Sequence, residues 1–180
     1  MTRLDPVLTT DDLPLAELHA ARLDGELFAL DSCFCPVDQW EYPTLRANTI
    51  ARQWPYRLIA EQRTAAWIYG VVPSPPSRHD LCADIGARAR PTNLRLANVR
   101  EVVMDPGDTV RIGELEVTTP LRTVVDLTRF SATFDNAERE MCRALLQLGG
   151  TGLDECIALM NRRRNLPNKR VALIRLASLN

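Results

Sequence analysis

The chain has 180 residues and a formal net charge of −1, and 46% of its residues are hydrophobic and 25% charged. These values are typical of one or two compact globular domains and exclude a disordered or fibrous chain. No apolar run approaches the roughly 20 residues of a membrane span, and the N-terminus has no apolar signal region. We therefore expect a soluble, cytoplasmic protein with no membrane partner.

Charge is distributed unevenly along the chain. Residues 1–66 carry six arginines against ten acidic residues, whereas residues 138–180 carry eight basic residues against four acidic ones. The basic end is therefore the C-terminal end. The five cysteines, an odd number without a Cys-x-x-Cys pair, favour reduced thiols over a disulfide scaffold.

The first elements are short. Apolar residues at helical spacing predict a helix near residues 13–22, and Asp24-Gly25 is a turn signal before the strand-like stretch 26–30. The segment is consistent with a hairpin that ends at Cys35-Pro36, where proline stops strand pairing.

Two further helices are predicted at residues 45–53 and 58–69, the second with Gly70 at its C-terminal cap. The proline-rich stretch 71–77 then separates two predicted parts, residues 1–70 and residues 71–180.

The second part begins with strand patterns. Strands are predicted at residues 79–85, 100–104 and 115–119, which together make a small sheet. Thr119-Pro120 then opens a helix, with a hydroxyl at the N-cap and proline at the first helical position. Arg122 and Asp126 lie one turn apart on this helix, close enough to pair.

The last third is predicted to be helical, over residues 135–148, 153–163 and 167–179. Gly149-Gly150 ends the first of these helices, and Thr151 with Asp154 resembles a capping box for the second.

One stretch carries a family resemblance. Its sequence is Gly113-Glu-Leu-Glu-Val-Thr-Thr-Pro-Leu-Arg-Thr-Val-Val-Asp-Leu-Thr-Arg129. It resembles the signature V-T-(S/T)-P-x-R-T-x-x-D-L of actinobacterial AbiEi-family antitoxins. The run Arg63-Thr-Ala-Ala-Trp-Ile-Tyr-Gly70 is similar to a helix of the same family, and the resemblance covers roughly residues 58–180.

The resemblance implies an α+β fold with a winged-helix-like N-terminal part, a small mixed β-sheet and a helical C-terminal part. The N-terminal part is degenerate, because residues 21–36 resemble the wing hairpin but carry Asp24, Glu26 and Asp31 in place of basic residues. DNA binding depends on Lys and Arg that neutralise phosphates, so it is doubtful for this acidic segment.

The function that the resemblance implies is that of an antitoxin. Such proteins pair with nucleotidyltransferase toxins of the AbiEii and MenT groups and neutralise them, most simply by covering the active site. Removal or alteration of a modification on the toxin is the other mechanism left open. The alternative function is a DNA-binding autoregulator of the toxin–antitoxin operon.

An enzyme is not expected, and neither is a cofactor, a metal or a small-molecule substrate. A related signature precedes a Vsr-like nuclease domain, which holds metal with a cluster of carboxylates. After residue 135 this chain has only four carboxylates, at Glu138, Glu140, Asp154 and Glu155. A fragment of a longer nuclease is the remaining interpretation.

Isolated cysteines and histidines do not change this expectation. Cys33 and Cys35 have no second ligand pair at zinc spacing, and His19 and His79 have no paired acid or nucleophile nearby in the sequence.

The candidate partner-binding residues are a C-terminal basic cluster that suits acidic groups of a toxin or nucleic acid. They are Arg162, Arg163, Arg164, Lys169 and Arg170. Trp40, Tyr42, Trp54 and Tyr56 are interface anchors if exposed and core residues if buried.

Overall fold

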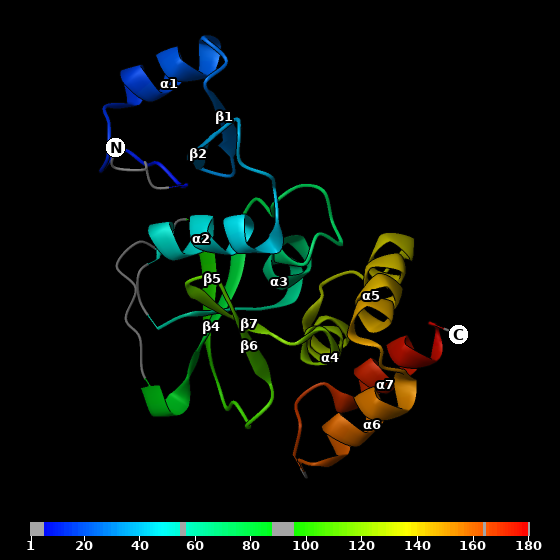
Figure 1. Ribbon diagram of the computed structural model, residues 1–180. Helices are drawn as coiled ribbons and strands as arrows, with labels where there is room; N and C mark the ends of the chain where they lie inside the picture. The colour runs from blue at the N-terminus through cyan, green and yellow to red at the C-terminus, as the bar shows by residue number, and fades with distance from the viewer. Residues whose placement is uncertain (1–5, 55–56, 88–95, 164, 180) are drawn as a thin grey trace.

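The chain folds as a mixed α+β protein, as expected. The structure, a computed structural model, describes residues 6–54, 57–87, 96–163 and 165–179. Figure 1 shows a small N-terminal unit above helix α2, a β-sheet below it, and a helical part to one side. Among the described residues, every helix is too short or too polar to span a bilayer.

The N-terminal unit consists of helix α1 (Leu15–Leu23) and an antiparallel hairpin of β1 (Leu27–Leu30) and β2 (Cys33–Pro36). Leu8 forms an isolated bridge to Phe34 on the outer side of β2. This is a helix with a wing-like hairpin.

Asp24-Gly25 forms the predicted turn between the end of α1 and β1, and the turn of the hairpin itself lies further on, between β1 and β2. The turn is made by Asp31 and Ser32, and Asp31 adopts a left-handed φ of 54°. Asp and Asn tolerate this conformation better than most residues, so the turn carried a weaker sequence signal than a glycine turn.

Helix α2 (Pro43–Gln53) follows the unit and packs beneath it. Cys33 and Cys35 of the hairpin share an apolar core with Leu45 and Ile50 of α2. At the rim, Arg52 pairs with Asp12 at 2.6 Å.

Asp31 makes the second polar tie. Its carboxylate lies 3.3 Å from His79 Nε2 and accepts a hydrogen bond from the Gln53 side chain. The N-terminal unit is thus fixed by apolar packing and by two carboxylates.

Five strands form the main sheet in the order β5-β4-β3-β7-β6. Parallel pairs (β4 with β5, β3 with β7) and antiparallel pairs (β3 with β4, β6 with β7) make it a mixed sheet. The strands are β3 (Ile59–Ala60), β4 (His79–Asp84), β5 (Ala97–Val102), β6 (Thr109–Ile112) and β7 (Leu115–Thr118), with a short 3₁₀ turn at Ile85–Ala87 after β4.

The predicted helix over residues 58–69 is wrong in its first turn. Residues 59 and 60 form β3, and helix α3 (Gln62–Ile68) begins only after Glu61. Strand β6 also escaped the sequence prediction. Strand β3 precedes residue 70 and pairs with β4 and β7, which follow it, so this sheet includes strands from both predicted parts.

The two faces of the sheet carry different neighbours. Ala60, Leu81 and Val117 face the core that α2 and Trp54 cover. Ile59, Cys82 and Val102 belong to a separate apolar cluster on the opposite face. The charged residues described below lie on that second face.

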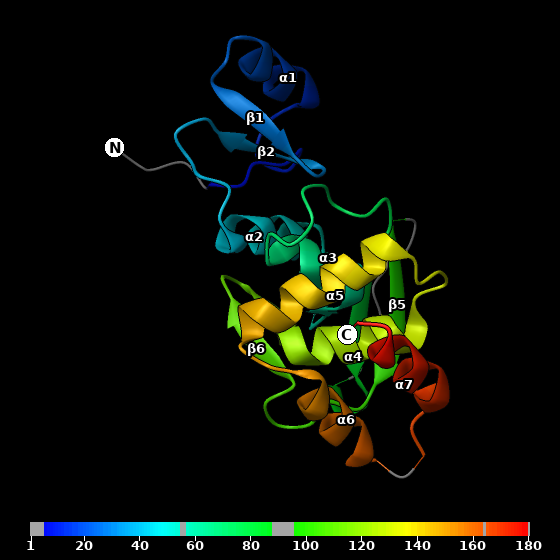
Figure 2. The same cartoon turned by 90° about the vertical axis from the view of Figure 1, so that its right-hand side faces the viewer.

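The C-terminal part consists of four helices around one apolar cluster. Glu155, not the predicted Asp154, closes the start of α6 by accepting from Gly152 N at 3.0 Å. The helices are α4 (Pro120–Phe130), α5 (Asn136–Gly149), α6 (Leu153–Asn161) and α7 (Lys169–Ala177), and Figure 2 shows α5 and α7 on the side away from the sheet.

Replacing Asp31 with asparagine keeps the left-handed turn and removes the charge. We expect amides of β1 and β2 to exchange about fivefold faster with solvent, because a charge-assisted hydrogen bond contributes roughly 1 kcal/mol more than a neutral one. Hydrogen exchange of the hairpin measures this. The control is Asp38→Asn, whose carboxylate accepts only from the neighbouring Gln39 side chain.

The same contact should weaken in acid. Burial alone would raise the pKa of Asp31, but the hydrogen bonds and charge of His79 and the hydrogen bond from Gln53 hold it below the usual 3.8. A lowered pKa means stabilisation that is present above the usual value and lost as pH falls through the folded-state value. Hairpin exchange that is independent of pH from 6 down to 2, after correction for intrinsic rates, would contradict this account.

Candidate functional site

The residues that match the family signature begin helix α4. Thr119 is the N-cap, and its hydroxyl accepts from Arg122 N at 3.4 Å. The Thr123 hydroxyl lies 2.7 Å from that of Thr118 at the end of β7. These contacts fix the angle at which the chain leaves the sheet and enters the helix.

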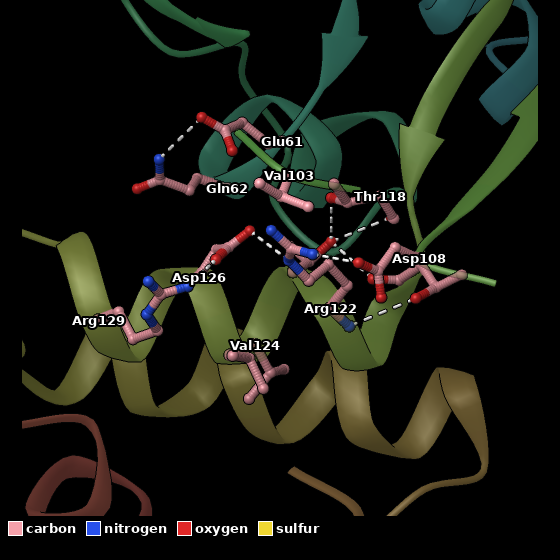
Figure 3. Close-up of polar contacts among 12 residues, drawn as sticks. Glu61, Gln62, Val103, Asp108, Thr118, Arg122, Val124, Asp126 and Arg129 are labelled. Carbon is pink, nitrogen blue, oxygen red and sulfur yellow. Dashed lines mark hydrogen bonds and ion pairs between the residues drawn. The ribbon is translucent and has the colours of Figure 1, made fainter. Parts of the chain in front are cut away.

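Asp126 is the centre of a charge network, of which Figure 3 labels Asp126, Arg122, Arg129, Asp108 and Glu61. Its side chain is fully buried, and Arg122 Nε and Arg129 Nη1 lie 2.8 and 3.0 Å from its two oxygens. Arg100 reaches the same carboxylate from β5, with Nη2 at 3.2 Å. Three guanidinium groups therefore share one carboxylate between helix and sheet.

Two more carboxylates complete the network. Glu61 accepts from Arg100 Nε and Nη2 at 2.6 and 2.5 Å, and Asp108 pairs with Arg122. Burial raises the pKa of Glu61 despite the opposing effect of Arg100. Three arginines and three carboxylates balance in formal charge. Pairing of this kind compensates the cost of removing charged groups from water.

The network has little room for a substrate. The cavity beside Asp108 and Arg122 measures about 10 Å³, which is no more than one water needs. We therefore interpret Thr119, Arg122, Thr123 and Asp126 as structural residues that position α4.

The other reactive side chains occupy structural positions. Within the described ranges, no three His, Cys, Asp or Glu residues group as metal ligands. Cys33 and Cys35 are buried in the hairpin core, and burial raises the pKa of Cys33 to about 12. His79 lies between Asp31 and the Thr64 hydroxyl, and the His19 ring packs edge-on against Phe34.

The predicted basic cluster divides in the structure. Arg163 Nη2 lies 2.7 Å from Asp105 and donates to Val103 O at 2.9 Å, so it joins the segment after α6 to the segment after β5. Arg164 lies outside the described residues. Arg162 and Arg170 are exposed, and Lys169 is half-buried.

Helix α7 adds apolar side chains to these charges. Only Ala172 and Leu176 are buried in it, whereas Val171, Leu173 and Ile174 are 43%, 36% and 67% exposed. Helices that are apolar on most sides are normally covered. We call Lys169, Arg170, Val171, Leu173 and Ile174 the α7 surface. Sequence reasoning found its charges but missed its exposed apolar residues.

A groove borders the α7 surface. It has a volume of about 480 Å³ and runs between the start of α6 and the end of α7. Leu153, Ile157 and Leu173 line it together with Asp154 and Glu155.

The aromatic residues also divide. Trp54 is a core residue with 4% exposure, whereas Trp40 and Tyr42 are 74% and 62% exposed. Tyr56 lies outside the described residues.

Comparisons with known proteins bear on the fold alone. No protein-family model matches the sequence, and neither does any curated protein. A solved structure, that of the RV2827C protein from Mycobacterium tuberculosis, is similar with a TM-score of 0.52 and 15% sequence identity. The match covers 97% of this chain and 71% of that chain, so it includes both the N-terminal unit and the helical part.

The network makes a prediction about stability. Asp126→Asn leaves the guanidinium groups of Arg100, Arg122 and Arg129, the last two of them buried, with one carboxylate fewer, which should lower the free energy of unfolding by about 3–5 kcal/mol. Urea denaturation measures the change. The control is Glu116→Gln, because Glu116 is exposed and only 3.8 Å from Arg111, and it should change stability by less than about 0.5 kcal/mol. Equal effects of the two substitutions would refute a central role for Asp126.

Proposed function

We propose that this chain is an antitoxin that binds a nucleotidyltransferase toxin directly and covers its active site. The sequence basis is the resemblance of residues 113–129 to the AbiEi-family signature. The structural observation that supports the proposal is the α7 surface. It combines exposed apolar residues with cations at the start of the helix.

The chemistry of this surface suits such a partner. Nucleotidyl transfer uses metal ions held by carboxylates, so the active-site cleft of the toxin presents acidic groups. Arg170 and Lys169 are available for them, because the structure gives their side chains no ion pair within the described residues. The apolar residues of the α7 surface can form the buried centre of an interface. Its cations can fix the orientation of the partner.

Occlusion requires only an interface of ordinary size. A stable one buries about 1,200–2,000 Å² in total, within reach of a chain with 10,396 Å² of accessible surface. No group transfer by the antitoxin is needed. Modification of the toxin remains the competing mechanism, and mass spectrometry of the toxin before and after contact distinguishes the two.

The DNA-binding alternative has one favourable observation, the helix and wing-like hairpin of the N-terminal unit. Strands β1 and β2 and their turn contain no basic residue, so the hairpin has no side chain to neutralise a phosphate. We therefore place promoter binding second.

The first test is co-expression with a candidate toxin, chosen as a nucleotidyltransferase encoded by a gene beside that of this chain. We expect growth rescue together with a complex that co-purifies. A toxic neighbour with neither rescue nor complex would end the antitoxin proposal and favour promoter binding, to be measured at two salt concentrations.

Substitutions on α7 locate the interface. Arg170→Glu and Ile174→Asp should each weaken the complex at least about tenfold, since losing a charge pair or an apolar anchor costs about 1.4 kcal/mol or more. Titration calorimetry measures the affinity. Arg111→Glu, an exposed arginine on β6, is the control that should bind as the unaltered protein does. Full affinity of both α7 variants would exclude this surface.

A further inference from the structure

The segment between β2 and α2 exposes aromatic side chains beside carboxylates. Val37, Trp40 and Tyr42 are 57%, 74% and 62% exposed. Asp38 and Glu41 alternate with them and are also exposed. We call residues 37–42 the Trp40 strip. Large exposed apolar side chains that cluster in this way mark interaction sites.

The strip is held at both ends. Val37 N donates to Glu26 O at 3.0 Å, and the Glu41 carboxylate pairs with Arg46 at 2.6 Å. Arg46 also donates to Trp67 O and, at 3.3 Å, to Val72 O, so it is anchored in the main body. A strip that is already fixed loses little conformational entropy on binding.

The surrounding charge selects the class of partner. Asp24 and Glu26 lie at the start of the adjacent hairpin and are exposed, and Asp38 lies within the strip. The cations of the described part of this region include Arg22, which is exposed, and Arg46, which pairs with Glu41 and so leaves Asp24, Glu26 and Asp38 as the exposed carboxylates. A surface with this excess of carboxylates repels nucleic acid and anionic lipid and attracts a basic protein surface.

Aromatic rings between carboxylates resemble a single-stranded nucleic acid, in which flat bases alternate with anionic phosphates. Proteins bind such strands with a basic groove for phosphates and with platforms on which bases stack. Trp40 and Tyr42 offer flat rings, and Asp38 offers an anionic oxygen pair.

We infer that the Trp40 strip docks in a basic, nucleic-acid-binding cleft of the toxin and excludes single-stranded nucleic acid from it. The inference rests on the proposed function for the identity of the partner. It adds a second contact, whose charge is opposite to that of the α7 surface. It also assigns the acidic N-terminal unit a role other than DNA binding.

The test uses the purified toxin and full-length variants in titration calorimetry. Trp40→Ala with Tyr42→Ala should weaken binding about thirtyfold, as removal of two aromatic anchors does. Leu15→Ala on α1, a residue 52% exposed, is the matched control and should leave the affinity unchanged. Circular dichroism verifies that each variant is folded.

Two further measurements separate this site from a merely apolar contact. Asp38→Lys should slow association several-fold at low ionic strength, with the difference disappearing in 0.5 M salt. Bulk tRNA should compete with the antitoxin for the toxin. Failure of tRNA to compete would overturn the inference.

Fluorine NMR reports on the strip directly. The chain contains three tryptophans, and Trp54 and Trp67 are 4% and 0% exposed. In protein labelled with 5-fluorotryptophan, addition of toxin should shift the Trp40 resonance and leave the other two nearly unchanged. An unshifted Trp40 resonance in a formed complex contradicts the inference.

The outcomes distinguish the two proposals. If the unaltered chain forms no complex with the toxin, both fail. If it forms one that survives the loss of Trp40 and Tyr42, the antitoxin function stands and the strip is not part of the interface. A second copy of this chain as the occupant would appear as self-association that the double variant abolishes.

Discussion

The neutralisation of Asp126 by three arginines is the constraint on which the rest of the fold depends. Arg100 reaches it from the sheet, and Arg122 and Arg129 reach it from its own helix. An unpaired ion in this position would carry a desolvation penalty of several kcal/mol, so α4 must lie where all three contacts form. That position leaves one side of α4 for α5, α6 and α7. The helical part is therefore oriented by a charge network and stabilised by apolar packing.

The sequence predicted the elements whose signals are local. Thr119 and Pro120 marked the start of α4, and the spacing of Arg122 and Asp126 predicted their pair, now seen at 2.8 Å. It did not predict β3, because two residues are too few for a periodic pattern. Their place in the sheet is decided by pairing with β4 and β7, which lie more than 20 and 50 residues away. Contacts of this kind override local propensity.

The candidate site was predictable to a smaller extent. The count of charged residues predicted a basic C-terminal surface. It did not predict that Arg163 pairs with Asp105, 58 residues earlier in the chain. The sequence also offered no reason to treat Trp40 and Trp54 differently. In the structure Trp40 is exposed, whereas Trp54 is buried. Exposure depends on the tertiary structure, and neither tryptophan has neighbours in sequence that reveal it. The useful signal at α7 was present, since a helix with so few polar residues has no obvious solvent face.

The charge network is neutral overall, so it does not cause the opposite signs of the two proposed surfaces. Its three arginines balance its three carboxylates, so the buried groups contribute almost no net field. The asymmetry between the acidic N-terminal and basic C-terminal thirds therefore comes from other residues, among them Asp24 and Asp38 at one end and Arg162 and Arg170 at the other. A chain of net charge −1 is then strongly polarised. A nucleotide-polymerising enzyme carries both signs as well, carboxylates for metal and cations for phosphate. In the proposed complex, opposed charges on both partners would favour one relative orientation during encounter and so contribute to specificity.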